Sequence, residues 1–239
     1  MNTVIPSVAD SSRVRRAASR VVAAALLLTG IVGVLHMPFA APFLRSVFPS
    51  ICPMKRGTPE QIDRAHALAV AAIQSSGTTA APARPALGFE LDKSTKADLD
   101  AWAAKHKVSC ASIAGNATLQ KCTAVPAAAV GQPESLGALE EVTFEFQSTG
   151  ALVNVQTLRR HLSPAQAAAA VSVLEQDAAS VLGAPTTVGG EPTAEHLSRG
   201  LLATYVAVHH FTDYRATVSA TNLASTGMMV REEYISAAR

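Results

Sequence analysis

Residues 140–166, EEVTFEFQSTGALVNVQTLRRHLSPAQ, decide the fold that this sequence predicts. In the first eight residues, apolar side chains alternate with polar ones, and the apolar ones are Val142, Phe144 and Phe146. This alternation is typical of a strand that has one face in water and one in a core. Ser-Thr-Gly at 148–150 then forms a turn, and a second strand follows over 151–160. The stretch therefore predicts an antiparallel hairpin.

A helix follows this hairpin. Ser163 and Gln166 have the spacing of a capping box, and Pro164 occupies the first helical position, where a missing N–H has no cost. The helix should end at Leu182, because Gly183 is the residue type that most often follows a helix C-terminus. The sequence thus predicts a long helix that packs against the sheet.

The chain around this stretch continues the two patterns. A helix capped by Ser94 or Thr95 should end near His106, and strand-like runs lie at 108–114, 118–125, 201–211, 214–223 and 228–236. Links of hairpin length between consecutive strands favour antiparallel pairing. The expected fold class is therefore α+β, with an antiparallel sheet of about seven strands and helices packed on one face. The order of elements also fits a tandem repeat of an α-β unit with three to four strands.

The N-terminal part of the chain has the features of a membrane anchor. No Lys, Arg, Asp or Glu lies between Arg20 and Arg45, and about 20 mostly apolar residues suffice to cross a hydrocarbon core as a helix. Four arginines precede this stretch, and the positive-inside rule keeps such a cluster in the cytoplasm. We therefore expect a single-pass protein of a bacterial-type inner membrane, with its C-terminal domain outside the cytoplasm, in the periplasm.

A cleaved signal peptide has the same basic and apolar regions, so the cleavage site has to discriminate between the two. The nearest candidate, Pro-Phe-Ala at 38–40 before Ala41, lacks the small residue expected three positions before the cut. Cys52, preceded by Pro-Ser-Ile at 49–51, likewise lacks the small residue that a lipoprotein signal has next to its cysteine. These departures favour an uncleaved signal anchor over cleaved export, and over a soluble helix buried in a core.

These expectations divide the chain into four parts. They are a cytoplasmic basic tail (1–20), a transmembrane signal anchor (21–44), a juxtamembrane helix and linker (45–87) and an extracytoplasmic α+β domain (88–239). Beyond the tail, 16 basic and 17 acidic residues remain, with no basic stripe among them. Such a body lacks the electrostatic footprint of a nucleic-acid-binding protein. The membrane and a protein partner in the cell envelope are therefore the expected contacts.

Several short stretches resemble small bacterial envelope proteins. Three stretches are similar to parts of two protein groups. LDKSTKADL at 91–99 resembles their capped helix start, and LGAP at 182–185 resembles their helix end. Residues 144–146 with 150–152 resemble their hairpin. These groups are the SmpA/OmlA outer-membrane-assembly lipoproteins and the β-lactamase-inhibitor-protein-like proteins. The resemblance spans about residues 88–237 and implies a fold and an envelope compartment, but it transfers no binding site. This chain departs from that pattern, because it has no lipobox and one helix per unit where that fold usually has two.

Two of the three cysteines predict a disulfide. Cys110 and Cys122 lie symmetrically about Asn116, so in a hairpin centred there they would face each other across the strands. An oxidising compartment makes a disulfide the expected outcome, and two buried free thiols are the alternative. Cys52 is then either a free thiol or one half of a disulfide between two molecules.

The sequence contains no motif that predicts catalysis, a cofactor or a metal ion. His209, His210 and Asp213 are the one cluster that resembles a set of metal ligands, but adjacent strand residues point to opposite faces, so the two histidines cannot bind one ion without a bulge. The pairs Glu140–Glu141 and Glu232–Glu233 split across the sheet for the same reason. This favours a protein that is not an enzyme and binds no cofactor, and it leaves open an envelope hydrolase with a dispersed active site.

One strand face remains as a candidate surface for a partner. If alternate residues of the run 214–223 pack beneath a helix, the opposite face carries Arg215, Thr217, Ser219 and Thr221 beside Arg231 and Glu233. A face of mixed charge either binds a partner or is simply solvated. The predicted function is therefore that of a membrane-anchored accessory or interaction module in the cell envelope.

Overall fold

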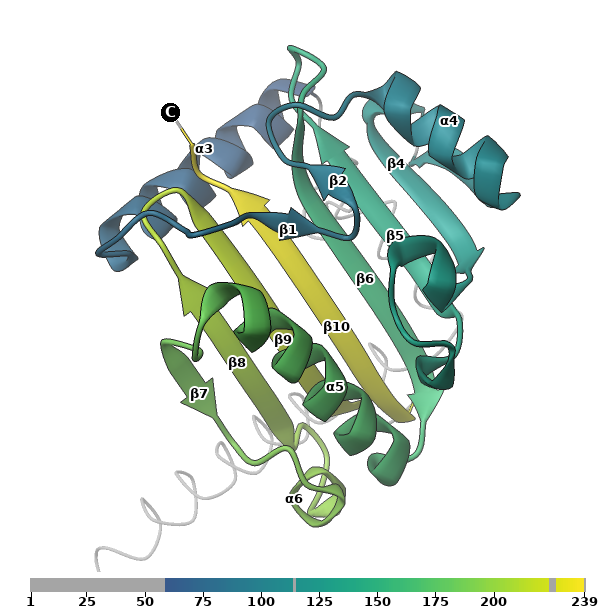
Figure 1. Cartoon of the computed structure of the whole chain (residues 1–239), viewed down its shortest axis with the longest axis vertical. Coiled ribbons are helices and arrows are strands. Elements are labelled where there is room, and N and C mark those ends of the chain that lie inside the picture. Colours follow the sequence, from purple (N-terminus) through teal and green to yellow (C-terminus); the bar gives the residue numbers. More distant parts are fainter. Residues whose placement is uncertain (1–58, 114, 224–226, 239) are drawn as a thin grey trace, which may run out of the picture. The chain divides into compact units, whose positions relative to one another are not determined.

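Eight antiparallel strands form one wide sheet with helices on both of its faces (Figure 1). A computed structural model describes residues 59–113, 115–223 and 227–238, which fall within one compact unit, Gly57–Arg239. The strand order is β3-β4-β5-β6-β10-β9-β8-β7. The fold class is thus α+β with a large antiparallel sheet, as the sequence predicts.

The sheet consists of two halves that each supply four strands. The first half contains β3 (Ser109–Ile113), β4 (Asn116–Val125), β5 (Leu139–Phe146) and β6 (Leu152–Leu162). The second half contains β7 (Thr187–Gly189), β8 (Thr204–His210), β9 (Tyr214–Leu223) and β10 (Gly227–Ser236). The two halves join where β6 pairs with β10, and each half follows a helix in the chain.

The second half has one strand more than the sequence indicates. The short strand β7 pairs with β8 through Thr187 and Val208, and it lies in a stretch that ends at Gly189 and Gly190. Three residues are too few for the alternation by which a strand is recognised, so the sequence pattern gives a loop here. Each half therefore has four strands that follow a helix, and the second half has the short helix α6 (Ala194–Ser198) between β7 and β8 in addition.

One face of the sheet, here called the helix face, is covered by α4 (Lys96–His106), α5 (Pro164–Leu182) and α6 (Ala194–Ser198). Two short 3-10 helices, η2 (Ala127–Val130) and η3 (Glu134–Leu136), lie between β4 and β5 in the chain. Ser163 and Gln166 form the expected capping box at the start of α5. Small and branched side chains of α5 and of the strands beneath it form one core. Among them are Ala167, Val171, Leu174, Val218, Ala220 and Val230.

The other core on the helix face contains the larger aromatic side chains. Trp102 of α4 lies edge-on to Phe89 and Phe144, at ring-centroid distances of 5.4 and 6.0 Å. Phe89 comes from a small hairpin of β1 (Pro85–Ala86) and β2 (Phe89–Glu90) that crosses the sheet on this side (Figure 1). Trp102 Nε1 donates a hydrogen bond to the Ala129 carbonyl, so its one polar atom is satisfied.

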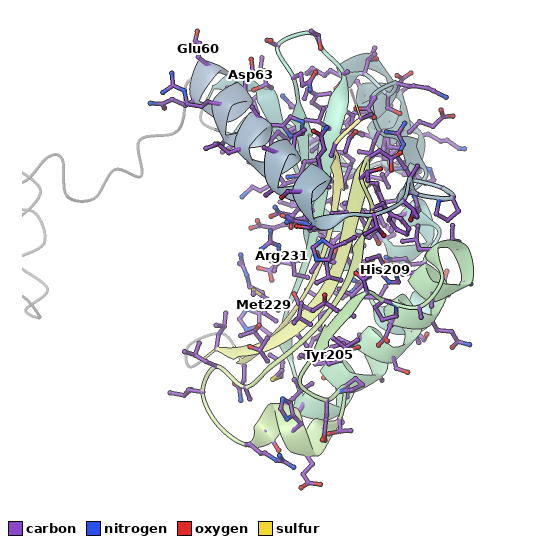
Figure 2. The ribbon with its side chains drawn as sticks, turned by 90° about the vertical axis from the view of Figure 1, so that its left-hand side faces the viewer. Glu60, Asp63, Tyr205, His209, Met229 and Arg231 are labelled. Carbon is purple, nitrogen blue, oxygen red and sulfur yellow. A yellow bond between two sulfur atoms is a disulfide. The ribbon has the colours of Figure 1, made fainter. Side chains whose placement is uncertain are left out.

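The helices of residues 88–239 pack on one face, as expected, whereas α3 (Pro59–Ser76), which precedes them, packs on the other. Figure 2 shows this helix, which carries Glu60 and Asp63, on the side of the sheet opposite α5. Its Ile73 packs with Ile235 and Ala237 at the end of β10. We expected residues 45–87 to be a juxtamembrane helix and linker; from α3 onward they contribute buried side chains to this unit.

The chain after α3 passes around the end of the sheet to reach the helix face. Thr212 donates its N–H to the Thr79 carbonyl, and the Ala81 N–H donates to the Asp213 carboxylate at 2.8 Å. Beyond this crossing, Arg84 and Asp92 form an ion pair at 2.6 Å. These contacts hold the crossing segment against the turn between β8 and β9.

The predicted disulfide between Cys110 and Cys122 is confirmed. The two residues are direct partners across β3 and β4, with Cα atoms 4.0 Å apart. Because β3 is the last strand at its edge of the sheet, the bond fastens that edge to the inner strand. Asn116 Oδ1 accepts the Thr118 N–H at the start of β4.

The predicted membrane anchor over residues 21–44 lies outside the described residues, and so does Cys52. Within the described part of the chain, no helix is both long and apolar enough to cross a bilayer. The anchor therefore stays a prediction from the sequence.

Gly77 provides a test of the crossing segment. A Cβ at this position would lie 2.1 Å from the Phe211 carbonyl carbon, so Gly77→Ala should force backbone apart. We expect a loss of about 1–3 kcal/mol in the free energy of unfolding, measured by urea denaturation. Gly200→Ala is the matched control, because a Cβ there meets nothing within 4 Å. Equal stability of the two variants would contradict the close contact.

Candidate functional site

The six residues predicted to bind a partner lie together on the face opposite α5, here called the open face. Along β9 they are half-exposed and alternate with the buried Ala216, Val218 and Ala220. The pairing of β9 with β10 places Thr217 opposite Glu233 and Ser219 opposite Arg231. Figure 2 shows Arg231 and Met229 on this side of the sheet and Tyr205 and His209 on the other. The residues are thus gathered as the strand pattern predicts.

Glu233 lies between two arginines on the open face. Its Oε2 accepts from Arg215 Nη2 at 3.1 Å and its Oε1 from Arg231 Nη2 at 2.6 Å. Gln156 of β6 donates to the same Oε1 at 2.9 Å. The side chains of Arg215, Arg231 and Glu233 are 27%, 39% and 15% exposed, so the carboxylate is the least accessible of the three. This triad therefore presents one unbalanced positive charge to the solvent.

Two cations on the neighbouring strands are paired with carboxylates. Lys121 of β4 lies 3.5 Å from Glu141, and Arg160 of β6 lies 3.0 Å from Glu140. Glu145 has a pKa raised by burial, and its Asn154 hydrogen bond opposes this shift. The negative charges of Glu233 and then of Asp63 in α3 add to the rise in this pKa. Among these charged groups, the Arg215–Glu233–Arg231 triad is the one in which two guanidinium groups share a single carboxylate.

The two adjacent histidines occupy opposite faces, as expected for neighbouring strand residues. His210 is half-exposed beside Arg215 on the open face, and burial and that arginine both lower its pKa. His209 is 1% exposed on the helix face, and neither of its ring nitrogens has a hydrogen-bond partner. Burial lowers the pKa of His209, while the nearby Glu175 opposes the shift. Glu175 itself accepts a hydrogen bond from Tyr205.

A buried polar network lies on the helix face where the two halves of the sheet meet. Glu232 of β10 accepts from Arg159 Nη1 at 3.3 Å, and the two side chains are 1% and 2% exposed. The carboxylate also accepts from Thr157, Tyr234 and Gln132, at 2.8, 2.7 and 2.8 Å. Gln132 belongs to the segment between η2 and η3. Four side chains from three parts of the chain thus share one buried carboxylate.

Sequence analysis placed Glu232 and Glu233 on opposite faces, which the structure confirms, but it missed the network. A signal was present. Arg159 and Glu232 occupy the apolar positions of their strands, in line with Val155 and Val230. A charge at such a position predicts a buried partner of opposite sign. The identity of that partner needed the pairing of β6 with β10.

Among the described residues, no group of three or more His, Cys, Asp or Glu side chains is placed to hold a metal ion. Comparison of the chain with protein-family models, with curated proteins and with solved structures gives no match. The candidate site therefore rests on the geometry of the open face and of the buried network.

The buried pair can be tested by removing one partner or both. Glu232→Ala leaves the Arg159 guanidinium buried without a carboxylate, so we expect a loss of about 3–5 kcal/mol in the free energy of unfolding. The double variant Arg159→Met with Glu232→Leu leaves no unpaired charge and should lose less. Glu195→Ala is the control, because Glu195 forms an exposed i,i+4 pair worth about 0.3–0.5 kcal/mol. An equal loss in the single and double variants would count against the pair.

The buried His209 should make the folded protein less stable in weak acid. Because its folded pKa is lowered, the unfolded chain takes up the proton first, and stability falls as the pH drops through about 6.5. His209→Leu should reduce this slope between pH 8 and pH 5.5. It should also raise stability at pH 8 by about 1–3 kcal/mol, because two unpaired buried nitrogens are removed. His161→Asn, at an exposed position, should leave the slope unchanged in the same urea titrations.

Proposed function

We propose that the chain is a membrane-anchored, extracytoplasmic interaction module that binds an acidic segment of a protein partner through its open face. The observation that carries the proposal is the Arg215–Glu233–Arg231 triad, which holds two guanidinium groups around one carboxylate on a half-exposed sheet. A carboxylate of the partner would complete the charge balance of the triad. Guanidinium groups suit this role, because each offers several N–H donors in a fixed plane.

The surroundings of the triad support a protein partner. Hydroxyl side chains of Thr217, Ser219 and Thr221 run beside it, and Leu158 lies directly opposite Arg231 on β6. Val206 and Val208 are half-exposed on β8, in register with Ser219 and Thr217. Arginine is enriched at protein interfaces, and the aliphatic side chains give the patch the apolar area that such an interface buries.

The difference in how far helices cover the two faces also supports the proposal. The helix face is covered by α4, α5 and α6. On the open face, α3 packs against Ile235 near the end of β10. The rest of the open face keeps half-exposed side chains along β9 and β10. The predicted anchor would hold this face outside the cytoplasm, near the membrane.

Photocrosslinking in intact membranes tests the docking surface. A photoreactive residue at Thr217, on the open face, should give a discrete crosslinked product, whereas one at Ala165, exposed on α5, should not. Neutralising the triad with Arg215→Gln, Glu233→Gln and Arg231→Gln should reduce that product at least tenfold, because the charge complementarity is lost. Raising the ionic strength should reduce it as well.

Glutamine is preferable here to a reversal of charge. Arg215→Glu with Arg231→Glu would place three carboxylates around one another and could disturb the fold. The matched control is Lys96→Gln with Asp100→Asn, which neutralises an exposed ion pair on α4. An undiminished product in the triad variant, with circular dichroism unchanged, would refute the proposed surface.

Membrane topology has its own test. A periplasmic reporter fused after Arg239 should be active and a cytoplasmic one inactive, because the arginine cluster keeps the N-terminus inside. The mature protein should retain that cluster, as measured by intact mass. A cytoplasmic C-terminus would refute the extracytoplasmic location, whereas loss of the first 40 residues would refute the anchor and leave the location intact.

A further inference from the structure

A groove of about 470 Å³ opens on the helix face, between η3, the first turns of α5 and the ends of β5 and β6. Its volume lies within the usual range of small-molecule sites. The walls are mainly aliphatic and come from Leu136, Leu139, Leu162, Ala169 and Ala170. The groove is on the opposite side of the sheet from the triad, so the proposed docking surface makes no use of it.

The polar side chains of the groove are matched in charge. Arg159 lines it and pairs with Glu232 at 3.3 Å, and Arg160 lines it and pairs with Glu140 at 3.0 Å. Each arginine is thus balanced by a carboxylate. A ligand that carried a charge into this groove would leave that charge without a counter-ion in largely apolar surroundings, which is costly. The charges therefore favour an uncharged ligand.

Arg159 also has an unused hydrogen-bond donor. Its Nη1 and Nη2 donate to Glu232 and Gln132, whereas its buried Nε–H has no acceptor among the described residues. A buried donor without a partner destabilises the structure that holds it, and a neutral acceptor can offset this cost. A carbonyl oxygen is such an acceptor, and it adds no charge beside Glu232.

We infer that this groove binds an uncharged aliphatic compound with a carbonyl group, such as an acyl amide or ester. The aliphatic chain contacts Leu136, Leu162 and Ala169, and the carbonyl faces Arg159 at the base of the groove. Because η3 follows Gln132 closely in the chain, the ligand also contacts the segment that supplies Gln132 to the buried network. Binding therefore stabilises the join between the two halves of the sheet.

Photoaffinity labelling of the full-length chain in membranes tests the site. The probe is octanamide that carries a diazirine at the end of its chain, and labelled peptides are mapped by mass spectrometry. We expect label on residues 135–140 and 162–170. Unmodified octanamide and methyl octanoate should compete with the probe, whereas octanoate, with the same chain and a negative charge, should compete at least tenfold more weakly.

Two variants and two controls locate the binding. Ala169→Phe fills the groove and Leu136→Ser removes part of its apolar wall, and each should reduce labelling at least tenfold. Ala165→Phe lies on the same helix outside the groove, and Leu201→Ser is exposed elsewhere, so both should leave labelling unchanged. Label spread evenly over the surface, undiminished labelling in both groove variants, or equal competition by octanoate would overturn the inference.

The outcome is independent of the proposed function. Crosslinking from Thr217 reports on the open face, and labelling at residues 135–140 reports on the helix face. Loss of one signal with the other intact identifies which of the two proposals has failed.

Discussion

The burial of one carboxylate at the join of the sheet constrains the rest of this structure. Glu232 lies between β6 and the segment that carries Gln132, and its oxygens accept from Arg159, Thr157 and Tyr234. An unpaired carboxylate in this position would have a high desolvation cost, so the network favours the one arrangement in which every partner is present. A register shift of one residue between β6 and β10 would move Glu232 to the open face and Glu233 into the core.

This join fixes which side chains share each face. With β6 and β10 in register, Arg231 and Glu233 come beside Gln156 and Leu158 on the open face, next to the hydroxyl residues of β9. On the helix face, the same register sets Arg159 at the base of the groove beneath η3 and α5. Two chemically different surfaces therefore depend on the same pairing. The open face carries two guanidinium groups around one carboxylate in the triad, and the groove is balanced in charge and largely aliphatic.

Helix α3 limits how much of the open face is accessible. It packs on Ile235 and Ala237 at one end of the sheet, and the chain then passes the β8–β9 turn with no room for a side chain at Gly77. The helix that follows the predicted anchor is thus attached to the sheet itself.

The sequence by itself determined the features that depend on residues close together in the chain. The alternation in β5, the capping boxes of α4 and α5, the split of His209 from His210 and the disulfide across β3 and β4 all follow from spacings of a few residues. The tertiary structure decided the order of the strands, the side on which α3 packs, the short strand β7 and the buried network. These depend on contacts between distant residues, such as Gln132 and Glu232, which are 100 residues apart. No local pattern encodes such a contact, because its energy arises when the whole sheet has brought both side chains out of water.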